Sequence, residues 1–136
     1  MKVLVLPLGE EHYALPLESV QQIISRPRVT RLPSSEPGIL GLLNVRGDIV
    51  PLFDAAVLLR SGTPGASTFA ILVSTSLGPA ALGVAVMPDA DEIDAEPSPA
   101  PPSEGGHVYP VGGRLVTLLA IEDLLVAGRT GQPRAS

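Results

Sequence analysis

Side chains that usually carry out catalysis or bind metals are scarce in this chain. There are no cysteines, and the only two histidines are His12 and His107. His12 falls in a predicted strand beside Tyr13, and His107 follows two glycines in a predicted loop. Catalysis needs several convergent polar groups, and zinc sites need closely spaced His or Cys ligands. The sequence therefore predicts no enzyme activity, no catalytic residue, no metal site and no cofactor.

An arginine set between two glycines is the strongest candidate for recognition. The stretch around it reads Gly-Leu-Leu-Asn-Val-Arg-Gly-Asp, from Gly41 to Asp48. Glycines at 41 and 47 permit tight backbone turns that a Cβ would hinder. Asn44 can cap or bridge the backbone groups of such a turn. The pattern predicts that Arg46 is held stiffly on a turn.

Two roles remain open for Arg46. Its planar guanidinium can present a fork of donors to carboxylates or carbonyls of another protein. It can also pair inside the chain with Asp48 or Asp54 and hold the turn. The residues alone do not choose between these two roles.

The charge balance excludes some partners. Nine basic residues against fourteen acidic ones give a net charge of −5, and Lys2 is the single lysine. Phosphate backbones and anionic membrane surfaces are bound by surplus Lys and Arg, so we expect no nucleic acid partner and no binding to an anionic membrane surface. We also expect no direct membrane insertion, because the apolar run at 3–8 is far too short to span a bilayer. Arginines 26, 28 and 31 cluster, while acidic residues gather in 89–96. Each group is either a solvated face or the flank of a docking groove.

Short strands must position these residues. Fourteen glycines and fifteen prolines punctuate segments rich in Val, Ile and Leu, which is typical of an all-β fold with two or three short helices. Helices are predicted at 17–24 and 120–126, with a shorter helical turn at 39–43. Because Pro51 cannot donate to a ladder, its strand should lie at an edge or bulge there. Strands are predicted at 3–8, 11–15, 28–32, 48–54, 69–75, 80–87, 108–111 and 115–119.

The length of 136 residues suits one domain. We expect this domain at 1–127, with two lobes that meet near 60–70, a Pro-rich loop at 95–106 and a disordered tail at 128–136. The apolar run at 3–8 is too short for a signal peptide core or a membrane span. The expected location is therefore cytoplasmic.

The central stretch resembles the CheW-like family of chemotaxis adaptors, whose hallmark is Gly-x-x-Asn-Leu-Arg-Gly-x-Ile-Val-Pro-Val-x-Asp. The flanking segments at 8–16, 20–24, 27–33, 81–86 and 114–125 resemble the family in the same order. The resemblance thus covers nearly everything except the Pro-rich loop and the tail. The matching residues are Gly41, Asn44, Arg46, Gly47, Ile49, Val50, Pro51 and Asp54.

The resemblance implies two SH3-like five-stranded β-barrels packed together. It also implies a non-catalytic adaptor that couples the cytoplasmic tip of chemoreceptors to the regulatory domain of a CheA-type histidine kinase. Such an adaptor is recruited to receptor arrays at the inner membrane. The alternative is a divergent scaffold or sequestering module that binds only one partner in a motility or developmental pathway. The receptor would bind in a groove between the barrels, which by the resemblance includes Val20, Gln22, Gly41, Asn44, Arg46 and Gly47.

Overall fold

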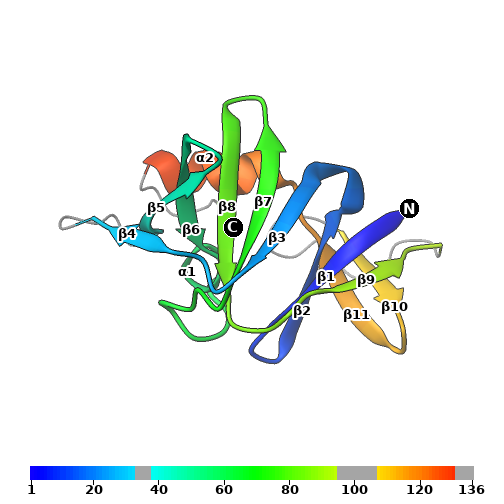
Figure 1. Ribbon diagram of the computed structural model, residues 1–136. Helices are drawn as coiled ribbons and strands as arrows, with labels where there is room; N and C mark the ends of the chain where they lie inside the picture. Colours follow the sequence, from blue (N-terminus) through cyan, green and yellow to red (C-terminus); the bar gives the residue numbers. More distant parts are fainter. Residues whose placement is uncertain (33–37, 95–106, 131–136) are drawn as a thin grey trace.

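The computed structural model describes residues 1–32, 38–94 and 107–130. The chain forms two β-sheets that pack together as two small barrel-like lobes, with two α-helices (Figure 1). This confirms the predicted fold class. The Pro-rich loop at 95–106 and most of the predicted tail lie outside the described residues.

Sheet A is built from the two ends of the described chain. It contains five strands in the order β10-β11-β2-β1-β9. The β1–β2 hairpin supplies its N-terminal part, and β11 joins it by parallel pairing with β2. The bounds are β1 (Lys2–Leu8), β2 (Glu11–Pro16), β9 (Asp89–Glu92), β10 (Val108–Val111) and β11 (Arg114–Leu118).

Sheet B is built from the middle of the chain. It contains six strands in the order β3-β7-β8-β6-β5-β4, because the short β4 adds a strand at one edge. Sheet B takes strands from both sides of residues 60–70. The bounds are β3 (Val20–Ser25), β4 (Val29–Arg31), β5 (Ile39–Val45), β6 (Asp48–Asp54), β7 (Phe69–Thr75) and β8 (Gly78–Val84).

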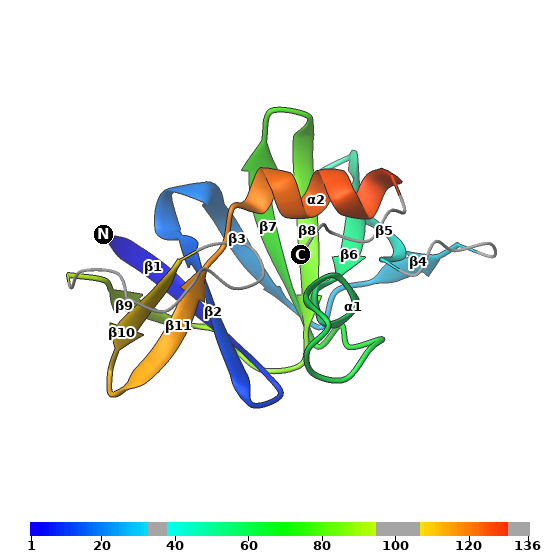
Figure 2. The same cartoon turned by 180° about the vertical axis from the view of Figure 1, so that it is seen from behind.

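The helices connect the lobes and cover them. A single 3-10 turn, η1 (Leu17–Ser19), leads from sheet A into sheet B, and α1 (Ala55–Leu59) follows β6. The longer α2 (Ile121–Thr130) confirms the helix predicted at 120–126 and lies across the back of sheet B (Figure 2). In the described part of the chain, no helix is long and apolar enough to cross a membrane.

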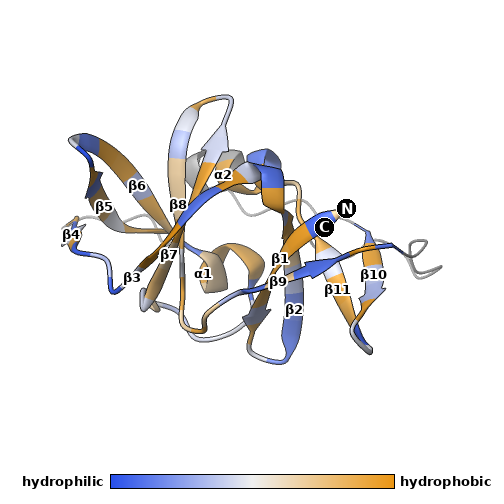
Figure 3. Ribbon diagram, turned by 45° about the vertical axis from the view of Figure 1, so that its right-hand side comes forward, coloured by the Kyte–Doolittle hydropathy of each residue, from blue (hydrophilic) through white to orange (hydrophobic). Residues whose placement is uncertain are grey.

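Three apolar clusters form the core. One lies within sheet A around Val3, Val5 and Val116, and another lies within sheet B around Leu43, Val50 and Leu72. The largest lies between them and takes side chains from both sheets and both helices. Figure 3 shows the resulting concentration of hydrophobic residues in the central strands. Members of the central cluster include Leu4, Leu6, Leu15, Phe53, Leu59, Ile71, Val73, Leu82, Leu124 and Leu125.

The helix predicted at 17–24 and the helical turn predicted at 39–43 are mainly strand. Only Leu17–Ser19 is helical, as the 3-10 turn η1, and the rest of the first segment belongs to β3. Val20, Ile23 and Ile24 have a helix-like spacing, but β-branched side chains favour strands. A bulge between Val20 and Gln22 breaks the strand alternation and so imitates a helical period. The apolar run at 39–43 is part of β5, whose pairing with β6 also contains a register shift, between Ile39 and Gly41.

Pro51 lies in an interior strand, so the edge position, one of the two predicted alternatives, is wrong. The other alternative was a bulge, and the pairing of β6 with β5 shifts register just beyond Pro51, between Ile39 and Gly41. β6 pairs with β5 on one side and with β8 on the other. The parallel ladder with β8 runs only from Leu52 to Asp54. Pro51 therefore comes just before that ladder, where no donor to β8 is needed.

Asp54 ties the end of β6 to the loop beyond α1. Its side chain is only 2% exposed. One carboxylate oxygen accepts the backbone N–H of Ala56 at 3.1 Å and caps α1, while the other accepts that of Gly65 at 2.7 Å. Both carboxylate oxygens of Asp54 therefore accept hydrogen bonds inside the chain. Asp is among the preferred residues at the N-cap of a helix.

We predict that Asp54→Ala lowers the free energy of unfolding by about 2–3 kcal/mol, because two N–H groups lose their acceptor in a buried site. Asp54→Asn should cost about 1–2 kcal/mol, since an amide offers only one acceptor oxygen. Urea unfolding followed by circular dichroism measures both changes. Asp48→Asn, at an exposed position on the same strand, is the control and should stay within about 0.5 kcal/mol of the parent. An Asp54→Asn variant as stable as the control would refute the dual role.

Candidate functional site

Arg46 lies on a two-residue turn that joins β5 to β6. Val45 pairs with Asp48, so Arg46 and Gly47 are the two central residues of the hairpin. Their φ angles are +53° and +91°. Positive φ at both central residues is the mark of the type I′ turn, which suits the twist of a tight hairpin. A non-glycine residue in this region is uncommon, so the backbone of Arg46 is held by the turn.

Asn44 stabilises the same turn. Its side-chain oxygen accepts the backbone N–H of Gly47 at 2.9 Å. This confirms the predicted bridging of the turn by Asn44. Glycine at 47 accommodates the positive φ without strain, and open space surrounds the position of its missing Cβ.

Gly41 has a different role from the predicted one. It lies within β5, opposite Arg31 of β4, and has no positive φ. A Cβ at this position would lie 2.4 Å from the carbonyl oxygen of Thr30, which is far inside contact distance. Gly41 therefore permits the close approach of two strands and not a turn.

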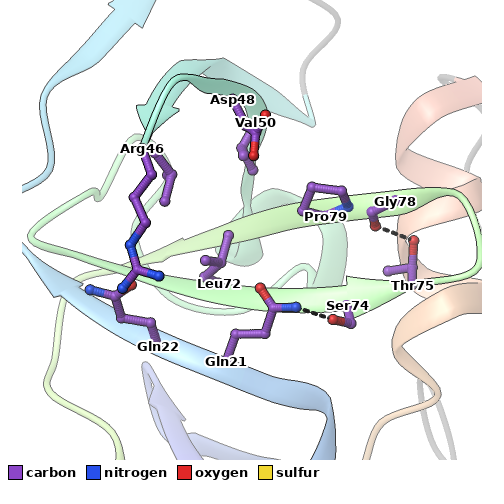
Figure 4. A pocket seen from close by; sticks show the side chains of 11 residues that line it. Gln21, Gln22, Arg46, Asp48, Val50, Leu72, Ser74, Thr75, Gly78 and Pro79 are labelled. Carbon is purple, nitrogen blue, oxygen red and sulfur yellow. Dashed lines mark hydrogen bonds between the residues drawn. The ribbon is translucent and has the colours of Figure 1, made fainter.

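A pocket of about 550 Å³ opens beside Arg46 at one end of sheet B. Its floor is apolar and consists of Val50 and Leu72, which belong to the cluster inside sheet B, and Val45, which packs against that cluster. Polar side chains surround the floor, and Figure 4 shows Arg46 extending toward Gln22 and away from Asp48. The rim residues are Gln21, Gln22, Arg46, Asp48, Ser74 and Thr75.

The guanidinium of Arg46 is exposed and available for a partner. Among the described residues, neither Asp48 nor Asp54 forms an ion pair with it, and Asp54 is committed to Ala56 and Gly65. The internal pairing that the sequence left open is therefore not seen. An exposed arginine on a rigid turn above an apolar floor has the form of a protein-binding site.

Hydrogen bonds hold the rest of the rim in place. The side chain of Gln21 on β3 donates to the hydroxyl of Ser74 on β7. The Thr75 hydroxyl donates to the Gly78 carbonyl at 2.7 Å across the β7–β8 turn. The backbone N–H of Ser76 then donates to a carboxylate oxygen of Glu122 on α2 at 2.5 Å. The β7–β8 turn is thus fixed to both β3 and α2.

The candidate site residues from the sequence divide into three groups. Gln22 and Arg46 line the pocket, while Asn44 and Gly47 build the turn beside it. Val20 pairs with Val73 and packs against the central cluster, so it lies outside the pocket lining, as does Gly41. All described lining residues come from sheet B, and the pocket therefore opens at the end of one lobe and not between the two.

Sequence reasoning missed several pocket residues. Adjacent residues on a regular strand point to opposite faces, so Gln21 is not expected beside Gln22. The bulge between Val20 and Gln22 breaks this alternation, and both glutamines line the pocket. Ser74 and Thr75 were not predicted as site residues, because no pattern in the sequence indicates that their strand lies near Arg46.

In the described part of the chain, no group of three or more His, Asp or Glu side chains is placed to hold a metal ion. His12 lies in β2 and His107 next to β10, so the two histidines belong to separate strands of sheet A. The pocket next to Arg46 contains neither of them. Its lining offers hydrogen bonds, charge and apolar contact.

Comparison with known proteins identifies the family. The model of the CheW-like domain matches residues 2–128. The chain is 28% identical over 127 residues to a chemotaxis protein CheW of Helicobacter pylori, covering 87% of this chain and 77% of that protein. It is also 29% identical over 83 residues to a chemotaxis protein CheW of Klebsiella aerogenes, covering 61% of this chain and 50% of that protein.

A solved structure has the same fold. The scaffolding protein TtCheW of Thermoanaerobacter tengcongensis superposes with a TM-score of 0.78 at 24% identity, covering 90% of this chain and 86% of that one. The family consists of non-catalytic scaffold and adaptor proteins of chemotaxis signalling. With a family match over nearly its whole length, the chain belongs to the CheW-like domain family.

Proposed function

We propose that this chain couples chemoreceptors to a CheA-type histidine kinase by binding both. In this role the receptor tip binds at the pocket beside Arg46, and the kinase regulatory domain binds elsewhere on the lobes. The protein then reaches receptor arrays at the inner membrane through its partners and not by insertion of its own. In this proposal the partners are the chemoreceptor tip and the kinase regulatory domain, and the receptor-binding surface is the pocket beside Arg46.

The observation that carries the proposal is the state of Arg46. Its backbone is fixed by a turn with positive φ, its side chain is exposed, and it has no carboxylate partner among the described residues. Arginines in such positions are enriched among residues that dominate binding energy, since the planar fork loses little freedom on binding. The apolar floor beneath it can take a side chain from a partner helix.

The shared central cluster supports a coupling mechanism. Both sheets and α2 contribute to it, so a displacement of one lobe is resisted by the core of the other. A rigid body that touches two partners makes the geometry of one depend on the state of the other. Such coupling needs no conformational change within the adaptor itself.

We predict that Arg46→Glu weakens binding of a soluble chemoreceptor fragment containing the hairpin tip by about tenfold or more, because the charge at the pocket rim is reversed. Isothermal titration calorimetry with a fragment from the same organism measures this change. The melting temperature of the variant should be unchanged, since the Arg46 side chain has no hydrogen-bond or ion-pair partner among the described residues.

Arg60→Glu is a matched control for that experiment. Arg60 is also an exposed arginine with a φ of +53°, but it lies at the C-cap of α1 and outside the lining of the pocket. Its variant should bind the receptor fragment as the parent does. Equal losses in the two variants, or full binding by Arg46→Glu, would rule out the pocket as the receptor site.

We also predict that the chain bridges the two partners. With the kinase regulatory domain immobilised, the receptor fragment should be retained only when the chain is added. Co-elution of all three proteins is the expected result. Retention of the fragment without the chain contradicts the bridging role, and a chain that binds only one of the two proteins is instead the single-partner scaffold that the sequence left as an alternative.

A further inference from the structure

A second pocket, next to the β5–β6 hairpin, carries a concentration of positive charge. It has a volume of about 360 Å³, and its lining includes Arg26 and Arg28. Arg31 follows on β4, and all three side chains are exposed. The chain as a whole has a net charge of −5, so the positive charge of the three arginines at this end of sheet B is opposite in sign to the net charge of the protein. Figure 1 shows β4 at the opposite end of the molecule from the acidic strand β9.

None of these arginines is neutralised by the described part of the chain. No carboxylate among the described residues forms an ion pair with Arg26, Arg28 or Arg31. A guanidinium that serves only to hold a fold usually has an internal acceptor, whereas an unpaired cluster attracts an anionic partner. The absence of carboxylate partners among the described residues therefore favours an external one.

The pocket beside Arg26 and Arg28 is also lined by apolar side chains. Its remaining lining includes Ile24, Leu43 and Val45, of which Leu43 is 2% exposed. These side chains belong to the apolar cluster inside sheet B or pack against it. A partner that fills this pocket must combine an aliphatic group with negative charge.

The backbone at the edge of the pocket is held in place. Arg26 has a φ of +51°, and its N–H donates to the carbonyl of Thr68 at 2.8 Å. A guanidinium on a fixed backbone loses less freedom when it binds than one on a mobile loop. Beside it, β4 is an edge strand that pairs only with β5 in the described sheet, so its outer edge is open to an extended segment.

We propose that this surface is a docking site for a short acidic segment of a partner protein, in which carboxylates flank one aliphatic residue. The carboxylates bind Arg26 and Arg28, and the aliphatic side chain enters the pocket over Leu43. The segment is extended and runs beside β4. This pocket adjoins the one beside Arg46 and shares Val45 with it, but the proposal does not depend on the function proposed for that neighbouring pocket.

The test uses a fluorescein-labelled peptide, Gly-Asp-Glu-Leu-Asp-Glu-Gly, and the full chain, with binding measured by fluorescence anisotropy. We expect saturable binding that weakens as salt is added. The double variant Arg26→Glu/Arg28→Glu should lose about tenfold or more in affinity. A second peptide with Ser in place of Leu should bind several-fold more weakly to the parent chain.

The control is the double variant Arg60→Glu/Arg114→Glu, which makes the same change in net charge at two other exposed arginines. It should bind the leucine peptide nearly as the parent does. Equal losses in the two double variants would show attraction to overall charge and overturn the proposal. Equal binding of the two peptides would overturn the role of the pocket, and no binding of the leucine peptide would overturn the site.

Discussion

The shared apolar layer between the two sheets is the constraint on which the rest of the structure depends. Strands of both sheets are buried on two faces, because one face lines its own lobe and the other faces the neighbouring lobe. In β1, Val3 and Val5 face the sheet A cluster, while Leu4 and Leu6 face the shared one. In β7, Leu72 and Ile71 divide in the same way. Each such side chain contributes about 1.5–3 kcal/mol on burial, so neither lobe can be separated without loss of a large part of its stability.

This layer explains why the recognition surface lies at the end of a lobe. Side chains in the middle of central strands such as β1, β7 and β8 are committed to the core on both faces. The groups free for partners therefore lie mainly on hairpin turns, strand ends and outer strands such as β3. The β5–β6 turn and the β7–β8 turn supply the rim of the Arg46 pocket for this reason. Bonds from Gln21 and Glu122 then hold the second turn in place. The core thereby fixes the positions of the two turns at the pocket rim, although these turns lie outside the core.

Much of this structure could be predicted from the sequence. Dense glycine and proline between Val-rich and Ile-rich segments indicated a β fold, and the match around Arg46 indicated the family. Periodicity failed where bulges interrupt the strands, as at Val20 and at Ile39, because the broken alternation resembles a helical spacing. The helix α1 was missed although Asp54 is a typical N-cap followed by two alanines.

The candidate site was only partly predictable for a related reason. Local chemistry identified the turn residues Asn44, Arg46 and Gly47, since their roles depend on neighbours in the sequence. Ser74 joins the site only through the pairing of β3 with β7, which is a long-range contact. Gly41 was assigned to a turn because its close contact with Thr30 depends on β4, whose register no local pattern reveals.

The order of the strands also affects how the protein is made. The strands of sheet B are contiguous in the chain. In sheet A, by contrast, β1 pairs with β9 and β2 pairs with β11, and both partners follow only after all of sheet B in the sequence. During synthesis, sheet B can therefore assemble while the N-terminal hairpin still exposes apolar faces on both sides. Until β9 and β11 are made, that hairpin lacks its partner strands, and unpaired apolar strands are prone to aggregate.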